Sequence, residues 1–168
     1  ERNRISDSVI LNTNINLKLP TETEWLNETN TWSTGDSAGA FSSVLKLTQA
    51  GYRFYQTGNL LDVNFTGIYG SRSVSGTFSM VQTFTTFVGG LSTFNRANGV
   101  SVRLIVDGTF TQIGYNNNYL GKTIQYLGLT YGFVYNTTTQ KIWLDRNLGA
   151  TQVATSFNDA ASYGDLYQ

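Results

Sequence analysis

Two glutamates with helical spacing come closest to an acid–base pair in this chain. Glu24 and Glu28 are four residues apart, and the pattern after Pro20 predicts a helix over residues 22–31 that would place both carboxylates on one face. Such a pair could serve as general acid and general base. The sequence favours a structural interpretation, because Thr21 and Glu24 form a capping-box motif and Glu28 would lie on a solvated helix face.

The other residue types needed for catalysis or metal binding are sparse. The chain contains no His and no Cys, which removes the commonest general base, thiolate nucleophiles and thiolate metal sites. Asp145 next to Arg146 is interpreted as a structural ion pair. We therefore expect no enzyme, no catalytic residues, no bound metal and no cofactor. A Ca²⁺ site needs converging acids, and those outside the predicted helix stand alone: Asp62, Asp107, Asp145, Asp159 and Asp165.

Composition narrows the choice of partners. The 168 residues carry 11 Lys plus Arg and 11 Asp plus Glu, so the formal net charge is zero, and only 13% of residues are charged. This balance excludes a nucleic-acid partner bound through phosphate neutralisation, and no apolar run approaches the ~18 residues of a membrane span. The chain is rich in Thr, Asn and Ser and has 10 Tyr and 10 Phe. This composition is typical of β-rich extracellular proteins, and near-zero charge favours self-association.

In the first two thirds of the chain, apolar–polar alternation predicts the secondary-structure elements that must position the candidate functional side chains. Residues 8–19 are expected to be extended until Pro20, and residues 33–43 are expected to form a loop of small residues. Turn signals separate five further predicted strands, at residues 44–47, 51–55, 66–71, 77–88 and 100–106.

The last third of the chain has a different composition, with many Tyr, Asn and Thr residues. Three asparagines at 116–118 predict a tight turn between strands, and further strands are expected at 131–135 and 142–144. A second helix is predicted over residues 159–167. Two short helices and eight or nine strands give an α+β fold that is mostly antiparallel β.

Several blocks together resemble one known family. Residues 142–150 (IWLDRNLGA) and 159–168 (DAASYGDLYQ) resemble the opening half of the Fibrobacter succinogenes major paralogous domain. Residues 19–25 (LPTETEW) resemble its middle helix. The blocks that resemble its closing half are residues 50–53 (AGYR), 59–63 (NLLDV), 69–73 (YGSRS) and 95–103 (NRANGVSVR).

The resemblance implies a C-type-lectin-like fold, related in architecture to formylglycine-generating enzymes. The activity of those enzymes needs reactive cysteines, which this chain lacks. The halves stand in inverted order: residues 1–107 resemble the closing half, and residues 142–168 resemble the opening half. Residues 108–141 lie outside the resemblance, as a linker or an added β-rich segment. The chain is then a circular permutant, one period of a tandem array, or a subunit whose residues 142–168 complete residues 1–107 of its neighbour instead of its own.

Two sets of residues are candidates for contacts with partners. Tyrosines of the unmatched segment could form a subunit interface, stack on sugar rings or fill the core. The arginines could bind an anionic glycan or donate hydrogen bonds to loop carbonyls. The interface candidates are Tyr115, Tyr119, Tyr126, Tyr131, Tyr135, Trp143, Leu144, Leu148, Tyr163, Leu166 and Tyr167. The ligand-binding candidates are Arg53, Tyr69, Arg72, Arg96 and Arg103.

These observations predict a non-catalytic extracellular structural protein. Its lectin-like modules would assemble head to tail into a surface filament, because a heterologous contact that does not close gives an open polymer. Its partners would then be copies of itself, at a cell surface or a virion surface. The alternative is a binding module that recognises surface glycans, as an adhesin or as a phage receptor-binding tail fibre.

Overall fold

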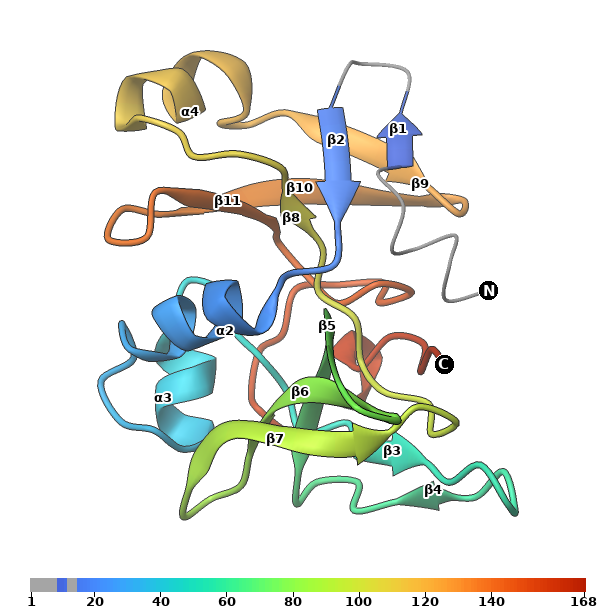
Figure 1. Ribbon diagram of the computed structural model, residues 1–168. Helices are drawn as coiled ribbons and strands as arrows, with labels where there is room; N and C mark the ends of the chain where they lie inside the picture. Colours follow the sequence, from blue (N-terminus) through green and yellow to red (C-terminus); the bar gives the residue numbers. More distant parts are fainter. Residues whose placement is uncertain (1–8, 12–14) are drawn as a thin grey trace.

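The computed structural model describes residues 9–11 and 15–168 and has an α+β fold with mostly antiparallel sheets (Figure 1). The larger sheet has the strand order β1 (Val9–Leu11), β2 (Ile15–Lys18), β8 (Ile105–Val106), β11 (Lys141–Leu144), β10 (Leu129–Asn136) and β9 (Thr123–Tyr126). The smaller sheet has the order β5 (Gly67–Ser75), β6 (Phe78–Phe84) and β7 (Gly89–Asn95), and a separate pair joins β3 (Tyr52–Arg53) to β4 (Leu60–Leu61).

Within the described residues there are three short α-helices, one more than predicted: α2 (Glu22–Thr29), α3 (Ser37–Ser42) and α4 (Gln112–Asn118). Helix α2 is confirmed together with its capping box. Thr21 Oγ1 accepts a hydrogen bond from the Glu24 N–H at 3.1 Å, and Glu24 Oε2 accepts one from the Thr21 N–H at 2.9 Å. These bonds satisfy two backbone donors that the first turn of a helix leaves free.

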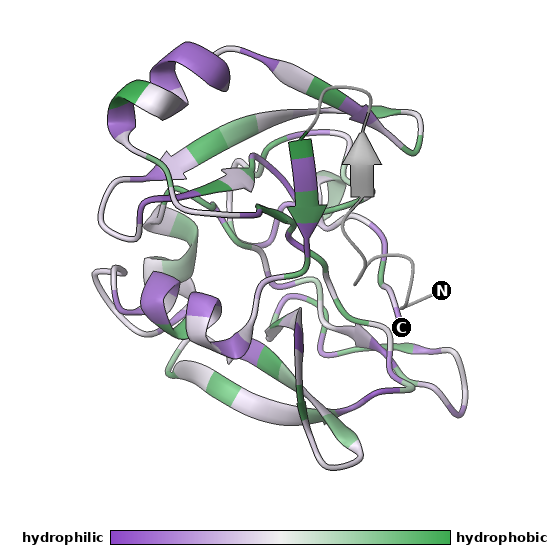
Figure 2. Ribbon diagram, turned by 45° about the horizontal axis from the view of Figure 1, so that its top comes forward, coloured by the Kyte–Doolittle hydropathy of each residue, from purple (hydrophilic) through white to green (hydrophobic). Residues whose placement is uncertain are grey.

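The two sheets form separate layers, with α2 and α3 beside the smaller sheet and α4 beside the larger one (Figure 1). Hydrophobic and hydrophilic residues alternate along β2, as a strand with one buried face requires (Figure 2). The larger sheet covers a core that includes Leu17, Leu104 and Ile142, all fully buried. A second core around Trp25, Tyr69 and Trp143 fills the space between the layers.

Helices replace one predicted loop, at residues 33–43, and one predicted turn, at residues 116–118. Residues 33–43 contain α3, because Asp36 caps it by accepting a hydrogen bond from the Gly39 N–H at 3.0 Å. The asparagines at 116–118 end α4 rather than forming a turn between strands, because Thr111 caps that helix through the Gly114 N–H at 3.1 Å. Small residues and asparagines are common in loops, but a good N-cap starts a helix even in such a sequence.

Other predicted elements are shorter than expected or absent. Residues 44–47 do not form a strand, and of the predicted helix over 159–167 only a 3₁₀ turn, Ala160–Ser162, is present. The predicted strand over 100–106 is regular only in β8, although Val100 and Ser101 make isolated bridges to other segments. The strands expected at 66–71, 131–135 and 142–144 are confirmed within β5, β10 and β11.

Replacing Thr21 by Ala removes the oxygen that accepts the Glu24 N–H. We expect Thr21→Ala to lower the free energy of unfolding by about 1 kcal/mol, measured by urea denaturation. Thr21→Ser keeps the hydroxyl and is the matched control, so it should stay close to the wild type. Equal losses for the two variants would contradict a role for the side-chain hydroxyl.

Candidate functional site

Two of the ligand-binding candidates, Arg103 and Tyr69, are buried in a polar network where the layers meet. Arg103 Nη1 donates to the carbonyl oxygens of Leu45 at 2.7 Å and Leu144 at 3.1 Å. Its Nη2 donates to Asn147 Oδ1 at 2.8 Å. Burial lowers the pKa of Arg103 to about 10, which still leaves the guanidinium charged at neutral pH. Neither side chain can reach a ligand at the surface, because Arg103 is 2% exposed and Tyr69 is fully buried.

Asn147 extends this network in the other direction. Its Nδ2 donates to Tyr69 Oη at 3.0 Å, to Thr48 Oγ1 at 3.1 Å and to the carbonyl oxygen of Tyr163 at 3.1 Å. The rings of Trp25 and Trp143 pack beside it with centroids 5.0 Å apart. Residues 142–168 therefore pack against residues 15–107 of the same chain. In this structure the contacts between the two segments are made within one chain and not between neighbouring subunits.

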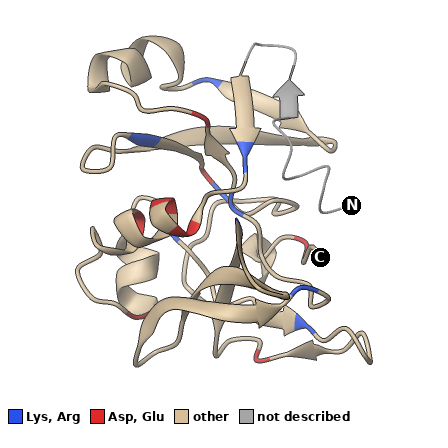
Figure 3. Cartoon of the chain, in the orientation of Figure 1, with Lys and Arg blue, Asp and Glu red and all other residues tan. Residues whose placement is uncertain are grey.

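The glutamates of α2 have separate environments. Glu24 Oε1 forms ion pairs with Lys18 at 3.2 Å and Lys141 at 3.1 Å, and Lys18 also pairs with Asp107 at 2.8 Å. Burial pushes the pKa of Glu24 upward, but the Thr21 backbone N–H and the lysines outweigh it and lower that pKa. Acidic residues of α2 and basic residues of the larger sheet lie on facing sides of the junction (Figure 3).

Glu28 is fully buried, so the prediction of a solvated helix face is wrong at this position. Its Oε2 accepts a hydrogen bond from Asn136 Nδ2 at 2.8 Å. Burial raises the pKa of Glu28 to about 7, against the opposite influence of Asn136, Trp32 and Arg103. Because Glu24 is held by lysines and Glu28 points into the core, the two do not form an acid–base pair. The periodicity of a short polar helix could not reveal that it would be covered on this side by β10.

The remaining arginine candidates are at the surface, and the side chains of Arg53 and Arg96 donate to backbone carbonyls of the chain itself. Arg53 Nη1 donates to the Gly58 carbonyl at 2.7 Å, and Arg96 Nη2 donates to those of Gly76 at 2.8 Å and Phe78 at 3.2 Å. Together with Arg103, these contacts confirm the interpretation that the arginines bond loop carbonyls. The predicted structural pair is also confirmed: Asp145 and Arg146 are joined by two hydrogen bonds of 2.9 Å each.

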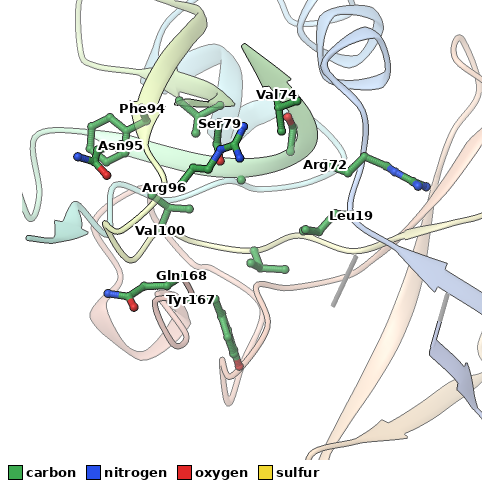
Figure 4. A pocket seen from close by; sticks show the side chains of 14 residues that line it. Leu19, Arg72, Val74, Ser79, Phe94, Asn95, Arg96, Val100, Tyr167 and Gln168 are labelled. Atoms are coloured by element: carbon green, nitrogen blue, oxygen red, sulfur yellow. The ribbon is translucent and has the colours of Figure 1, made fainter. Parts of the chain in front are cut away.

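Arg72 and Arg96 line a surface cavity of about 210 Å³ at one end of the smaller sheet. The cavity walls are largely apolar and come from separate segments, including Leu19, Val74, Val81, Phe94, Val100 and Tyr167. Arg96 extends toward Ser79, whereas Arg72 points away from it (Figure 4). Among the described residues, no acidic side chain lines the cavity. Of the five predicted ligand-binding residues, the structure brings only these two to one cavity.

Many of the predicted interface residues belong to the chain's own core. Five are buried in this structure and have little surface to offer a partner: Tyr115, Tyr131, Trp143, Leu144 and Leu148. Tyr115 and Tyr131 belong to the added segment, residues 108–141, which forms α4 and contributes β9 and β10 to the larger sheet. The others are half-buried: Tyr119, Tyr126, Tyr135, Tyr163, Leu166 and Tyr167.

Several strongly exposed apolar residues are not among the predicted candidates, and some of them lie at the ends of the smaller sheet. Residues 73–95 contain no charged side chain, and this stretch includes all of β6 and β7. At one end of the smaller sheet Phe87 is 91% exposed and Val88 is 66% exposed. At the other end Val74 is 63% exposed. The long run without charged residues was the feature of the sequence that could have indicated this apolar surface.

Comparison with known proteins adds no relative. No family model, curated protein or solved structure matches the chain. Among the described residues, no helix is both long and apolar enough to cross a membrane. The same residues contain no group of three or more acids that could hold a metal ion.

Burial of Glu28 makes stability depend on pH between about 4.5 and 7. Its pKa is higher in the folded chain than in the unfolded chain, so the folded state binds more protons in this window and stability falls as the pH rises. Since a tenfold change in proton affinity is worth about 1.4 kcal/mol, ionising Glu28 costs about 3 kcal/mol at pH 8. We expect Glu28→Gln to remove most of this loss, measured by urea denaturation at pH 5 and pH 8.

The chain suits this measurement because it has no His, the side chain that ordinarily titrates in the same range. Glu22 is half-buried at the start of the same helix, so Glu22→Gln is the matched control: it makes the same substitution and leaves Glu28 in place. A wild-type protein equally stable at both pH values would contradict a raised pKa for Glu28.

Proposed function

We propose that this chain is a non-catalytic extracellular structural module that self-associates into a filament. The observation that carries the proposal is the smaller sheet, whose strands β6 and β7 carry no charge and which exposes apolar side chains at both ends: Phe87 and Val88 at one, Val74 at the other. Exposed apolar patches mark protein interaction sites, and the low charge of these two strands leaves little electrostatic repulsion between copies.

The outer edge of β7 also favours association. Its neighbour in the sheet is β6, and within the described residues no hydrogen bond outside the sheet reaches the backbone of residues 90–94. Proteins usually protect such an edge with charges, prolines, bulges or a covering segment. Strand β7 contains neither a charged residue nor Pro.

The charged and polar groups that might perform chemistry are engaged in holding the fold. Glu24, Asp145 and Arg146 are in ion pairs, and Arg103 is enclosed by carbonyl oxygens and Asn147. This supports a structural role. The lectin-like fold remains part of the proposal, supported by the resemblance and by the close packing of residues 142–168 on residues 15–107. The extracellular location rests on the composition.

Self-association predicts a mass that rises with concentration. In sedimentation velocity over micromolar to millimolar concentrations, we expect the 18.6 kDa chain to form species well above the monomer, with elongated particles in electron micrographs. Sulfate should promote assembly, because it strengthens the burial of apolar surface. A chain that stays monomeric throughout this range, with or without sulfate, would contradict the proposal.

One observation favours glycan binding as a second function. The cavity near Phe94 combines an apolar wall with polar groups from Asn95 and Arg96, and such mixed linings are common in small-molecule sites. Under this alternative, a glycan array probed with the purified chain gives hits, and Phe94→Ala weakens the best hit at least tenfold, about 1.4 kcal/mol. Ile113→Ala, on α4 and 72% exposed, is the control. An array without hits would contradict it.

A further inference from the structure

The turn between β6 and β7 presents two apolar side chains to solvent. Phe87 is 91% exposed and Val88 is 66% exposed, and both belong to the uncharged stretch. Leaving a phenyl ring in water forgoes the stabilisation that burial would bring, so this turn gains from contact with an apolar surface.

This turn is held in a defined shape. The Thr85 N–H donates to the Val88 carbonyl at 2.7 Å, and Thr85 Oγ1 accepts from the N–H groups of Phe87 and Val88, both at 3.2 Å. The Thr85 carbonyl in turn accepts from the Ser37 N–H at 2.8 Å, which fastens the turn to the start of α3. A fixed turn loses little conformational entropy when it binds, which favours its use as a docking element.

The cavity at the opposite end of the same sheet suits such a side chain. An apolar cavity of about 150 Å³ is enough to bind benzene, and this one measures about 210 Å³. Its apolar wall includes Val74, Val81, Phe94 and Val100. Arg96 at the rim could contact the face of an inserted ring as a cation–π partner.

The strand register separates the turn from the cavity. In the β6–β7 hairpin, Phe84 pairs with Gly89 beside the turn, and Phe78 pairs with Asn95 beside the cavity. Seven-residue strands separate these two pairs by about 20 Å. Figure 1 shows the turn and the far end of β7 at opposite ends of the sheet. A single copy therefore cannot fill its own cavity with its own turn.

We propose that the Phe87–Val88 turn of one copy inserts into the cavity of the next copy, with Phe87 against the wall formed by Val74 and Phe94. This inference rests on the proposed self-association and names its contact. Because the turn and the cavity are different surfaces, the contact is heterologous and repeats without closing, which generates a linear polymer. A second copy is the fitting occupant because each copy presents both matching surfaces: an exposed phenyl ring on an uncharged turn, and a largely apolar cavity with the Arg96 guanidinium at its rim.

Two variants disable the two surfaces separately. Phe87→Ala removes the inserted ring, and Val74→Lys places a charge at the mouth of the cavity, where Val74 is 63% exposed. Both positions are at the surface, so each variant should keep the wild-type Tm. In sedimentation velocity we expect each variant alone to associate at least tenfold more weakly than the wild type, whereas Ile113→Ala should assemble normally.

Mixing the two variants tests the direction of the contact. Phe87→Ala retains an intact cavity and Val74→Lys retains an intact turn, so an equimolar mixture should form a discrete dimer that cannot grow. A mixture that stays monomeric, or a Phe87→Ala variant that assembles like the wild type, would overturn this contact while leaving self-association in place. A wild-type chain that never associates would overturn both.

Discussion

The packing of the two layers depends on a single buried guanidinium, that of Arg103. Arg103 is charged and almost completely enclosed, and it is satisfied by carbonyl oxygens of Leu45 and Leu144 and by the amide of Asn147. A buried charge is tolerated only when its donors are paired, so each of these segments must be in place together. Tyr69 joins through Asn147, which brings the smaller sheet into the same network. The packing of the two layers depends on this junction.

Other charged side chains also lie at the junction between the layers. Only 13% of residues are charged, and several of them lie around the larger sheet and its junction with α2, including Lys18, Glu24 and Lys141. The smaller sheet is left without charge between Arg72 and Arg96. Two uncharged strands with exposed apolar residues beside them are suited to contact with other protein surfaces, which connects the internal arrangement of charge to the proposed assembly.

Sequence patterns predicted several features that depend on neighbouring residues, although they missed the local N-caps that start α3 and α4. The capping box of Thr21 and Glu24 and the strands β5, β10 and β11 are local, and all are present. Features that depend on distant segments were not predictable. Glu28 is fully buried, and its hydrogen-bond partner Asn136 lies 108 positions away along the chain. The cavity could not be predicted from the sequence either, because its walls come from segments as distant as Leu19 and Tyr167.

The strand order also has a consequence for how the chain reaches its folded state. Strand β8 lies between β2 and β11, and Val100 bridges to Tyr167, so early and late segments interleave in one sheet and one core. Folding must close long loops before these contacts form, and a high contact order slows folding. The central strand β8 lacks one of its neighbours until β11 (Lys141–Leu144) has been synthesised. Until then the edge of β8 is unpaired, and unpaired strand edges make partly folded chains prone to aggregation.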